Sequence, residues 1–187
     1  MTAGLFPKPY ADLVARLRVP SGFLLAAAFV WFAQPSLQSM EYGLPISIAG
    51  LALRAWAAGH LAKNQRLATS GPYAYTRNPL YLGTLIVASG LAVAGRSTGL
   101  SILFAAVFLL VYLPVILLEE QHLHQLFPEY ADYARQVPSL LPRRKAWPGS
   151  TRFNSQLYWK NQEYQAALAF LAGVALLAWK CMIIKQS

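Results

Sequence analysis

Residues 79–120 read PLYLGTLIVASGLAVAGRSTGLSILFAAVFLLVYLPVILLEE. This stretch contains two apolar runs, Pro79–Gly95 and Gly99–Leu118, which are separated only by residues 96–98. A hydrocarbon core about 30 Å thick is crossed by roughly 20 helical residues, and helices joined by so short a turn are antiparallel neighbours. The stretch therefore predicts a transmembrane hairpin, with Pro114 as a kink in its second helix.

The composition of the whole chain is that of a membrane protein. Of its 187 residues, 56% are hydrophobic and 12% are charged, whereas soluble domains carry about a quarter charged residues. Three further apolar runs have a length that suits a bilayer: Val19–Pro35, Leu44–Leu61 and Ala166–Ile184. We therefore expect an all-α integral membrane protein with about five transmembrane helices. Pro20 and Pro45 are expected near the starts of the first two helices.

Few residues are of the kinds that usually hold metals. The single cysteine, Cys181, excludes an internal disulfide and a cysteine-based zinc site, and the three histidines form no HExxH or comparable set. The sequence therefore predicts no metal site. The net charge of +9 would suggest nucleic acid in a soluble protein. In a membrane protein an anionic cytoplasmic bilayer face explains it better, so no nucleic-acid partner is expected.

The distribution of Lys and Arg indicates the orientation in the membrane. If the N-terminus is cytoplasmic, most cations lie in cytoplasmic segments, Arg54 lies inside a span, and only Arg96, Lys180 and Lys185 lie toward the outside. This arrangement follows the positive-inside rule. It places the start of the third helix and the end of the fourth helix together on the cytoplasmic side.

The start of the third helix carries the first motif, GPYAYTRNPLYLG at 71–83. Its two X-Pro steps predict a structured loop over residues 71–78 that enters a helix at Pro79. Backbone amides at a helix start, together with the guanidinium of Arg77, suit the carboxylate or hydroxyls of a polar cofactor. Aromatic faces for a base or a cation are offered by Tyr73, Tyr75 and Tyr81. Such residues also anchor helices at bilayer rims, and the motif alone leaves both interpretations open.

Two adjacent glutamates, Glu119 and Glu120, continue the fourth helix past its apolar run. Neighbouring helical residues point about 100° apart, so at most one of them faces a given partner well. A charge at a membrane boundary is unfavourable unless it is paired or hydrogen-bonded, which makes the pair a candidate site. Ordinary solvation among lipid headgroups is the alternative.

A short amphipathic helix is expected beyond Pro128, ending at Pro138. Its apolar positions recur at helical spacing: Tyr130, Tyr133, Ala134 and Val137. This aromatic face is expected to pack on the loop or on the bilayer.

Taken in order, the first motif and LLEEQHLHQLFPEYADYARQVPSLLP at 117–142 resemble the signature of the isoprenylcysteine carboxyl methyltransferase and phospholipid methyltransferase superfamily. That pattern reads GPY, Arg-His-Pro, Tyr and Gly, then a hydrophobic hairpin, Glu-Glu, Phe-Gly, Tyr, Tyr, Val and Pro. The resemblance covers about residues 50–143 of the chain. Two positions depart from it, since Asn78 replaces the commoner His and Pro128 the commoner Gly. Asn does not titrate, which puts in doubt any role of this position as a general base.

The resemblance implies methyl transfer from S-adenosylmethionine to a lipid-borne or apolar acceptor, a carboxylate, amine or thiol, that reaches the site from the membrane. A Rossmann GxGxxG is absent, so the cofactor is expected in a cytoplasmic pocket between the two motif ends. The expected cofactor-binding residues are Tyr73, Arg77, Asn78, Pro79, Tyr81, Leu82, Gly83, Glu119, Glu120, Tyr130 and Tyr133. Arg77, Glu119 and Glu120 are also the candidates for a catalytic role.

Arg54, deep in the second apolar run, is a candidate for recognising an acidic acceptor headgroup. A role of Arg54 in fixing the packing of the helices is an equally good interpretation. The resemblance also divides the chain into a methyltransferase core over 1–142 and a basic linker with a C-terminal transmembrane helix over 143–187.

Two other classes of function stay open at this point. A membrane NADPH-dependent sterol-type reductase should show a basic constellation for the 2′-phosphate, and the loop region offers only Lys63, Arg66 and Arg77. A non-catalytic membrane scaffold leaves the glutamate pair and the Arg-Asn-Pro loop without an explanation.

Overall fold

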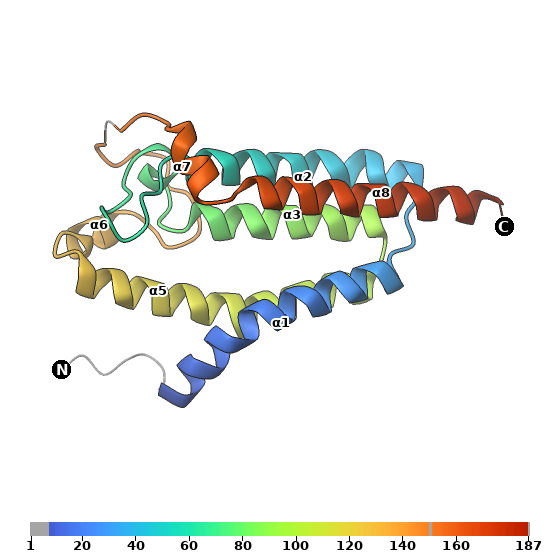
Figure 1. Cartoon of the computed structure of the whole chain (residues 1–187), viewed down its shortest axis with the longest axis horizontal. Coiled ribbons are helices and arrows are strands. Elements are labelled where there is room, and N and C mark those ends of the chain that lie inside the picture. Colours follow the sequence, from blue (N-terminus) through green and yellow to red (C-terminus); the bar gives the residue numbers. More distant parts are fainter. Residues whose placement is uncertain (1–7, 150, 187) are drawn as a thin grey trace. The chain divides into compact units, whose positions relative to one another are not determined.

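The computed structural model describes residues 8–149 and 151–186, and within these ranges the chain is helical, without a β-strand. In chain order the elements are α1 (Lys8–Phe32), α2 (Leu37–Ala58), the 3-10 helix η1 (Gly71–Ala74), α3 (Pro79–Gly95), α4 (Thr98–Val107), the π-helix η2 (Phe108–Tyr112), α5 (Leu113–Leu126), α6 (Tyr130–Gln136), α7 (Ser155–Lys160) and α8 (Tyr164–Gln186) (Figure 1). The predicted all-α class is confirmed.

Helices cover most of each predicted apolar run, although α1 ends at Phe32 and α2 at Ala58, three residues before the predicted ends; α3 has the predicted bounds. In the described part of the chain, Thr98–Leu126 and Tyr164–Lys185 are long and apolar enough to cross a membrane. Val19–Phe32 and Pro79–Gly95 are shorter apolar helices. An integral membrane protein is supported, whereas the number of spans stays a prediction.

The predicted helix starts near Pro20 and Pro45 are wrong. Both prolines lie inside helices, in α1 and α2 respectively. An interior proline removes one hydrogen bond and strains the preceding turn, but it need not end a long helix that is stabilised elsewhere. The start of α2 is set instead by a reciprocal cap between Ser36 and Ser39. The N–H of Ser36 donates to the Ser39 hydroxyl (2.9 Å) and the N–H of Ser39 to the Ser36 hydroxyl (3.2 Å).

The second helix of the hairpin runs from Thr98 to Leu126 through a π-helical turn. In this turn the N–H of Leu113 donates to the carbonyl of Phe108, a bond that spans five residues. Pro114 follows directly, and a proline ring collides with the carbonyl four residues before it while offering no N–H. The wider π turn accommodates such a defect within one continuous helix. The irregularity predicted at Pro114 is therefore a π-helical turn that lies just before the proline.

The described chain divides into two compact units. The first unit contains residues 8–47, 88–121 and 172–186. Its apolar core is formed by Ala28, Phe29, Ala33, Ala94, Leu100 and Leu177. The second unit contains residues 48–87, 122–149 and 151–171. It holds the loop before α3, the helix α6 and the start of α8.

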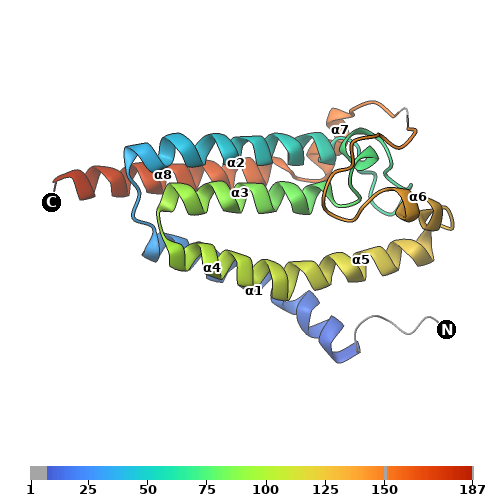
Figure 2. The same ribbon diagram turned by 180° about the vertical axis from the view of Figure 1, so that it is seen from behind.

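Within the second unit, α2 and α3 approach each other at two glycines, and the two helices run side by side in both views (Figures 1 and 2). A Cβ atom added to Gly50 would lie 2.7 Å from the carbonyl oxygen of Gly83 and 2.7 Å from the nitrogen of Val87. No side chain fits there. Small residues allow such close backbone contact between membrane helices. The contact brings Arg54, one turn beyond Gly50, against α3.

Candidate functional site

The loop that precedes α3 is tied to the chain that follows α6. Backbone hydrogen bonds of 2.9–3.1 Å join Arg77 N to Pro138 O, Asn78 N to Ser139 O, Arg143 N to Tyr75 O and Trp147 N to Ala74 O. As predicted, the loop is ordered and α3 begins at Pro79. The first motif and the tail of the second motif are thus parts of one folded assembly.

Asn78 is a cross-link in this assembly. Its side chain is 7% exposed, and its Nδ2 donates to the carbonyl of Ser139 (3.0 Å) and to the hydroxyl of Ser139 (3.2 Å). Its backbone carbonyl accepts from the N–H of Leu82 in the first turn of α3 (3.0 Å). The hydroxyl of Thr76 also donates to the Ser139 carbonyl (3.0 Å). Asn78 therefore fixes the helix start to the segment after Pro138.

Arg77 is held against α6. Its Nη1 donates to the carbonyl of Ala134 (3.2 Å), and its guanidinium carbon lies 5.9 Å from the centroid of the Tyr130 ring. That distance is within the range of about 6 Å for a cation–π contact. On the same helix, the buried hydroxyl of Tyr133 donates to the carbonyl of Tyr73 (2.6 Å). Of the two surfaces expected for the aromatic face of this helix, the loop and the bilayer, the structure shows contacts with the loop.

The first turns of α3 hold the remaining predicted residues of the first motif. Pro79 and Tyr81 are buried, and Leu82 is half-buried. Gly83 faces α2, where an added Cβ would lie 2.9 Å from the carbonyl oxygen of Gly50. In this structure Gly83 thus permits the close approach of two helices.

Glu119 and Glu120 lie on α5, in the first unit. Glu120 is buried, whereas its neighbour is half-buried. The difference follows from the angle between adjacent helical side chains. Both residues lie beyond the π turn of the same continuous helix.

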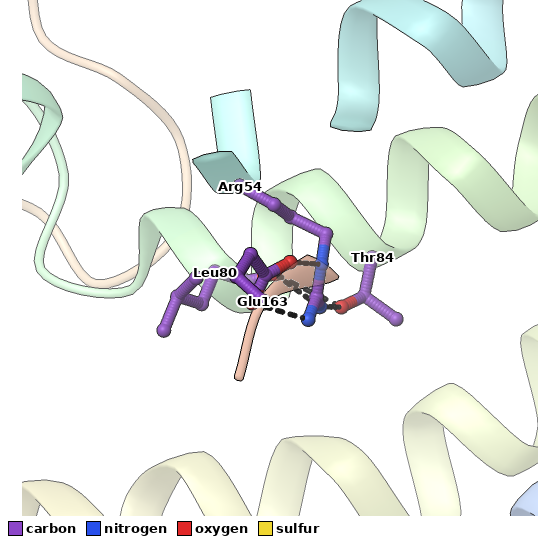
Figure 3. A network of polar contacts seen from close by, with 4 residues as sticks. All are labelled: Arg54, Leu80, Thr84 and Glu163. Carbon is purple, nitrogen blue, oxygen red and sulfur yellow. Dashed lines mark hydrogen bonds and ion pairs between the residues drawn. The ribbon is translucent and has the colours of Figure 1, made fainter. Parts of the chain in front are cut away.

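Arg54 has a carboxylate partner that sequence reasoning did not single out. Its Nε donates to Glu163 Oε1 (2.6 Å) and its Nη2 to Glu163 Oε2 (3.0 Å), while Nη1 donates to the hydroxyl of Thr84 (Figure 3). The side chain of Glu163 is only 8% exposed. A two-pronged pair of this kind is short and geometrically specific. The available signal was an acidic residue just before an apolar helix, in a chain with few carboxylates.

The segment before α8 also closes the end of α2. The side chain of Asn161 donates to the carbonyls of Ala58 (3.0 Å) and Leu61 (2.9 Å). The backbone N–H of Asn154 donates to the carbonyl of Gly59 (2.9 Å). The last carbonyls of a helix have no partners within it, so these contacts satisfy part of that end. Residues 153–163 are therefore built into the second unit.

Across residues 8–149 and 151–186, no group of three or more His, Cys, Asp and Glu side chains gathers closely enough to hold a metal ion.

Comparison with known proteins gives one family and several curated relatives. The model of the phospholipid methyltransferase family matches residues 46–130. The cobalt-zinc-cadmium resistance protein CzcN of Cupriavidus metallidurans is 37% identical over 110 residues, which cover 58% of this chain and 50% of that protein. The nickel-cobalt-cadmium resistance protein NccN of Alcaligenes xylosoxydans xylosoxydans is 34% identical over 115 residues, 60% of this chain and 53% of that protein.

A third relative is named for an enzymatic activity. The protein-S-isoprenylcysteine O-methyltransferase of Schizosaccharomyces pombe is 28% identical over 141 residues, which cover 72% of this chain and 59% of that protein. The chain spans about half the length of the first two relatives. No solved structure matches it.

The matched region runs from α2 through the loop, the hairpin and both glutamates to Tyr130. It therefore contains most of the two motifs in their family order, and the relative from S. pombe extends the similarity over a longer part of the chain. These matches support the similarity of the chain to the superfamily of integral membrane methyltransferases that includes the isoprenylcysteine carboxyl methyltransferases and the phospholipid methyltransferases.

Proposed function

We propose that the chain is an integral membrane enzyme that transfers a methyl group from S-adenosylmethionine to a lipid-borne or apolar acceptor. The observation that carries this proposal is the family match over residues 46–130. The burial of the motif residues supports it. A residue that only anchors a helix at a bilayer rim is exposed to headgroups, whereas Tyr130 and Tyr133 are 1% and 2% exposed.

The residues of both motifs have the chemistry that the cofactor needs. The start of α3 and the guanidinium of Arg77 suit its carboxylate. Glu119 and Glu120 can accept hydrogen bonds from its amino group or its ribose hydroxyls. Flat faces for its base and its sulfonium are offered by Tyr73, Tyr81, Tyr130 and Tyr133. With Asn78, Pro79, Leu82 and Gly83 shaping the backbone, these residues form the proposed cofactor site.

When bound, the cofactor supplies an electrophilic methyl group for an in-line displacement. The protein contributes positioning and the exclusion of water, and a nucleophilic side chain is not required. An amine or thiol acceptor also needs a base, whereas a carboxylate acceptor does not. Asn78 does not titrate and donates to Ser139, so we assign it a positioning role.

The role of Arg54 and the orientation of the chain in the membrane are also proposals. An acidic acceptor headgroup at Arg54 would have to replace Glu163, because the existing pair is already neutral. The distribution of Lys and Arg supports a cytoplasmic N-terminus and cytoplasmic motifs.

Thermal unfolding of the purified full chain in detergent tests the choice of cofactor. S-adenosylmethionine at about 100 times its Kd should stabilise the folded protein by about 2.7 kcal/mol. NADPH at the same concentration is the matched control and should have no effect. Stabilisation by NADPH alone would support the reductase, and stabilisation by neither would favour the scaffold.

A further inference from the structure

A surface pocket lies in the first unit, at the end of α3 that is remote from the motif loop. Its volume is about 780 Å³, and it is lined by Gln34, Pro35, Ser36, Leu37, Gln38, Arg96, Cys181, Ile184 and Lys185. The lining comes from the α1–α2 linker, the first turn of α2, the α3–α4 turn and the last turns of α8. The proposed cofactor site uses none of these residues.

Hydrogen bonds hold the walls of this pocket together. The N–H of Gln34 donates to the carbonyl of Gly95 (2.8 Å), and the hydroxyl of Ser39 donates to the carbonyl of Ala94 (2.8 Å). From α8, the ammonium of Lys180 donates to the carbonyl of Ala33 (2.8 Å). The linker and the start of α2 are thus joined to the end of α3, and the linker is also joined to α8. A pocket whose lining segments are joined by hydrogen bonds can present its side chains to a ligand in a fixed arrangement.

The charge of the lining is positive. Arg96 and Lys185 are both exposed, and no carboxylate lines the pocket. Glu41, on the next turn of α2, is exposed and lies outside the lining. The amide side chains of Gln34 and Gln38 add neutral donors. Such a set of donors matches the oxygens of a phosphate group.

The lining also includes apolar side chains. Leu37 and Ile184 line the pocket and are largely exposed, and Trp31 and Trp179 are exposed nearby on α1 and α8. Exposed tryptophans are enriched where membrane helices meet the headgroup layer. A ligand in this pocket would therefore meet cations, amide groups and apolar side chains.

We propose that this pocket binds the phosphate of an anionic phospholipid, with the acyl chains along the exposed apolar face of α8. Arg96 and Lys185 contact the phosphate, and the side chains of Gln34 and Gln38 donate to its oxygens. This role also explains why these two cations depart from the positive-inside pattern. The bound lipid is a structural partner distinct from the methyl acceptor.

The single cysteine provides a local readout, because Cys181 lines the pocket and is half-buried. The purified full chain in neutral detergent is treated with N-ethylmaleimide, and the labelling rate is followed by mass spectrometry. Phosphatidylglycerol at about ten times its Kd should slow labelling about tenfold, because only the unbound fraction reacts. Phosphatidylcholine and inorganic phosphate at the same concentration should leave the rate unchanged.

Variants test which residues hold the lipid. In Arg96→Gln/Lys185→Gln, protection by phosphatidylglycerol should be lost, because removing each charged contact weakens binding about tenfold or more. Lys185→Gln alone, near the exposed end of α8, repeats the test with less risk to folding. Arg96→Lys/Lys185→Arg should keep the protection, as should Arg152→Gln/Lys160→Gln, which removes two exposed cations from the second unit.

Several results would overturn the proposal. One is an unchanged labelling rate of the parent protein in phosphatidylglycerol. Another is equal protection of the parent and the Arg96→Gln/Lys185→Gln variant. Equal protection by inorganic phosphate would show that a free anion, and not a lipid, occupies the pocket. Equal protection by phosphatidylcholine would show that the phosphate charge is not recognised.

Discussion

Asn78 stands at a position of the family signature and cross-links two segments of the fold. Its side chain donates to Ser139 at a position where the superfamily more often has His. Asn and His can both present an N–H at this place, so the contact does not require a titrating group. The departure from the family pattern therefore leaves the loop and the segment after Pro138 joined.

The first residue-scale prediction concerns this cross-link. Asn78→Ala should lower the free energy of unfolding by about 1–2 kcal/mol, because buried acceptors lose a donor. Asn78→His should retain most of the stability. It should also introduce a loss of turnover near the usual pKa of His, about 6.5, which the parent should not show at this position. Thermal unfolding and pH profiles at saturating cofactor measure both effects, and equal stability of Asn78→Ala and parent would contradict the cross-link.

The second residue-scale prediction concerns the glutamate pair. Changing Glu119 or Glu120 to Gln should weaken binding of S-adenosylmethionine by about 1–3 kcal/mol for whichever residue contacts the cofactor. Glu41→Gln, at an exposed position of α2, is the matched control and should bind like the parent. Isothermal titration calorimetry gives the affinities. If both variants bind like the parent, the glutamates are not part of the cofactor site.

At the scale of elements, the segment before α8 joins the helix ends of the second unit. Glu163 pairs with Arg54, and Asn161 satisfies carbonyls at the end of α2. From the sequence this segment was predicted only as a basic linker. Its contacts join residues about a hundred positions apart, and no local pattern reports such pairs. For the same reason, the hydrogen bond from Thr76 to Ser139 could not be predicted from the sequence.

Removing one partner of the Arg54–Glu163 pair should destabilise the protein strongly. Glu163→Gln leaves a partly buried guanidinium without its carboxylate, and a loss of about 3 kcal/mol is expected. Arg54→Gln/Glu163→Gln should be less destabilising than the sum of the two single variants, because it leaves no isolated charge. Chemical unfolding of the four proteins completes the cycle. Additive effects would show that the pair does not interact in solution.

The contact between α2 and α3 gives a second prediction at this scale. Gly50→Ala places a methyl group against the α3 backbone and should cost about 1–3 kcal/mol of stability. Gly22→Ala in α1 is the control, since nothing lies within 4 Å of its added Cβ. That control should be neutral or stabilise the helix by about 0.5–1 kcal/mol. A Gly50→Ala variant as stable as the control would place the two helices further apart than the structure does.

At the scale of the whole molecule, local signals predicted the helical class, the loop, the start of α3 at Pro79 and the helix α6. Each depends on hydrophobic period or on proline chemistry within a few residues. The starts of α1 and α2 were missed because Pro20 and Pro45 are tolerated inside long helices, while the Ser36–Ser39 cap lacks the usual acidic partner. A cofactor pocket that joins the motif ends stays a prediction.

Transfer of a labelled methyl group to an apolar acceptor is a direct test of methyltransferase activity. The purified full chain is incubated with methyl-labelled S-adenosylmethionine and membranes from cells that lack its gene, so that the acceptor is still unmethylated. We expect label in the apolar extract with the parent protein, and a large loss of that label with Glu119→Gln/Glu120→Gln. An apolar extract with no more label than a sample without protein, while the cofactor stays intact, would contradict the assignment as a membrane methyltransferase.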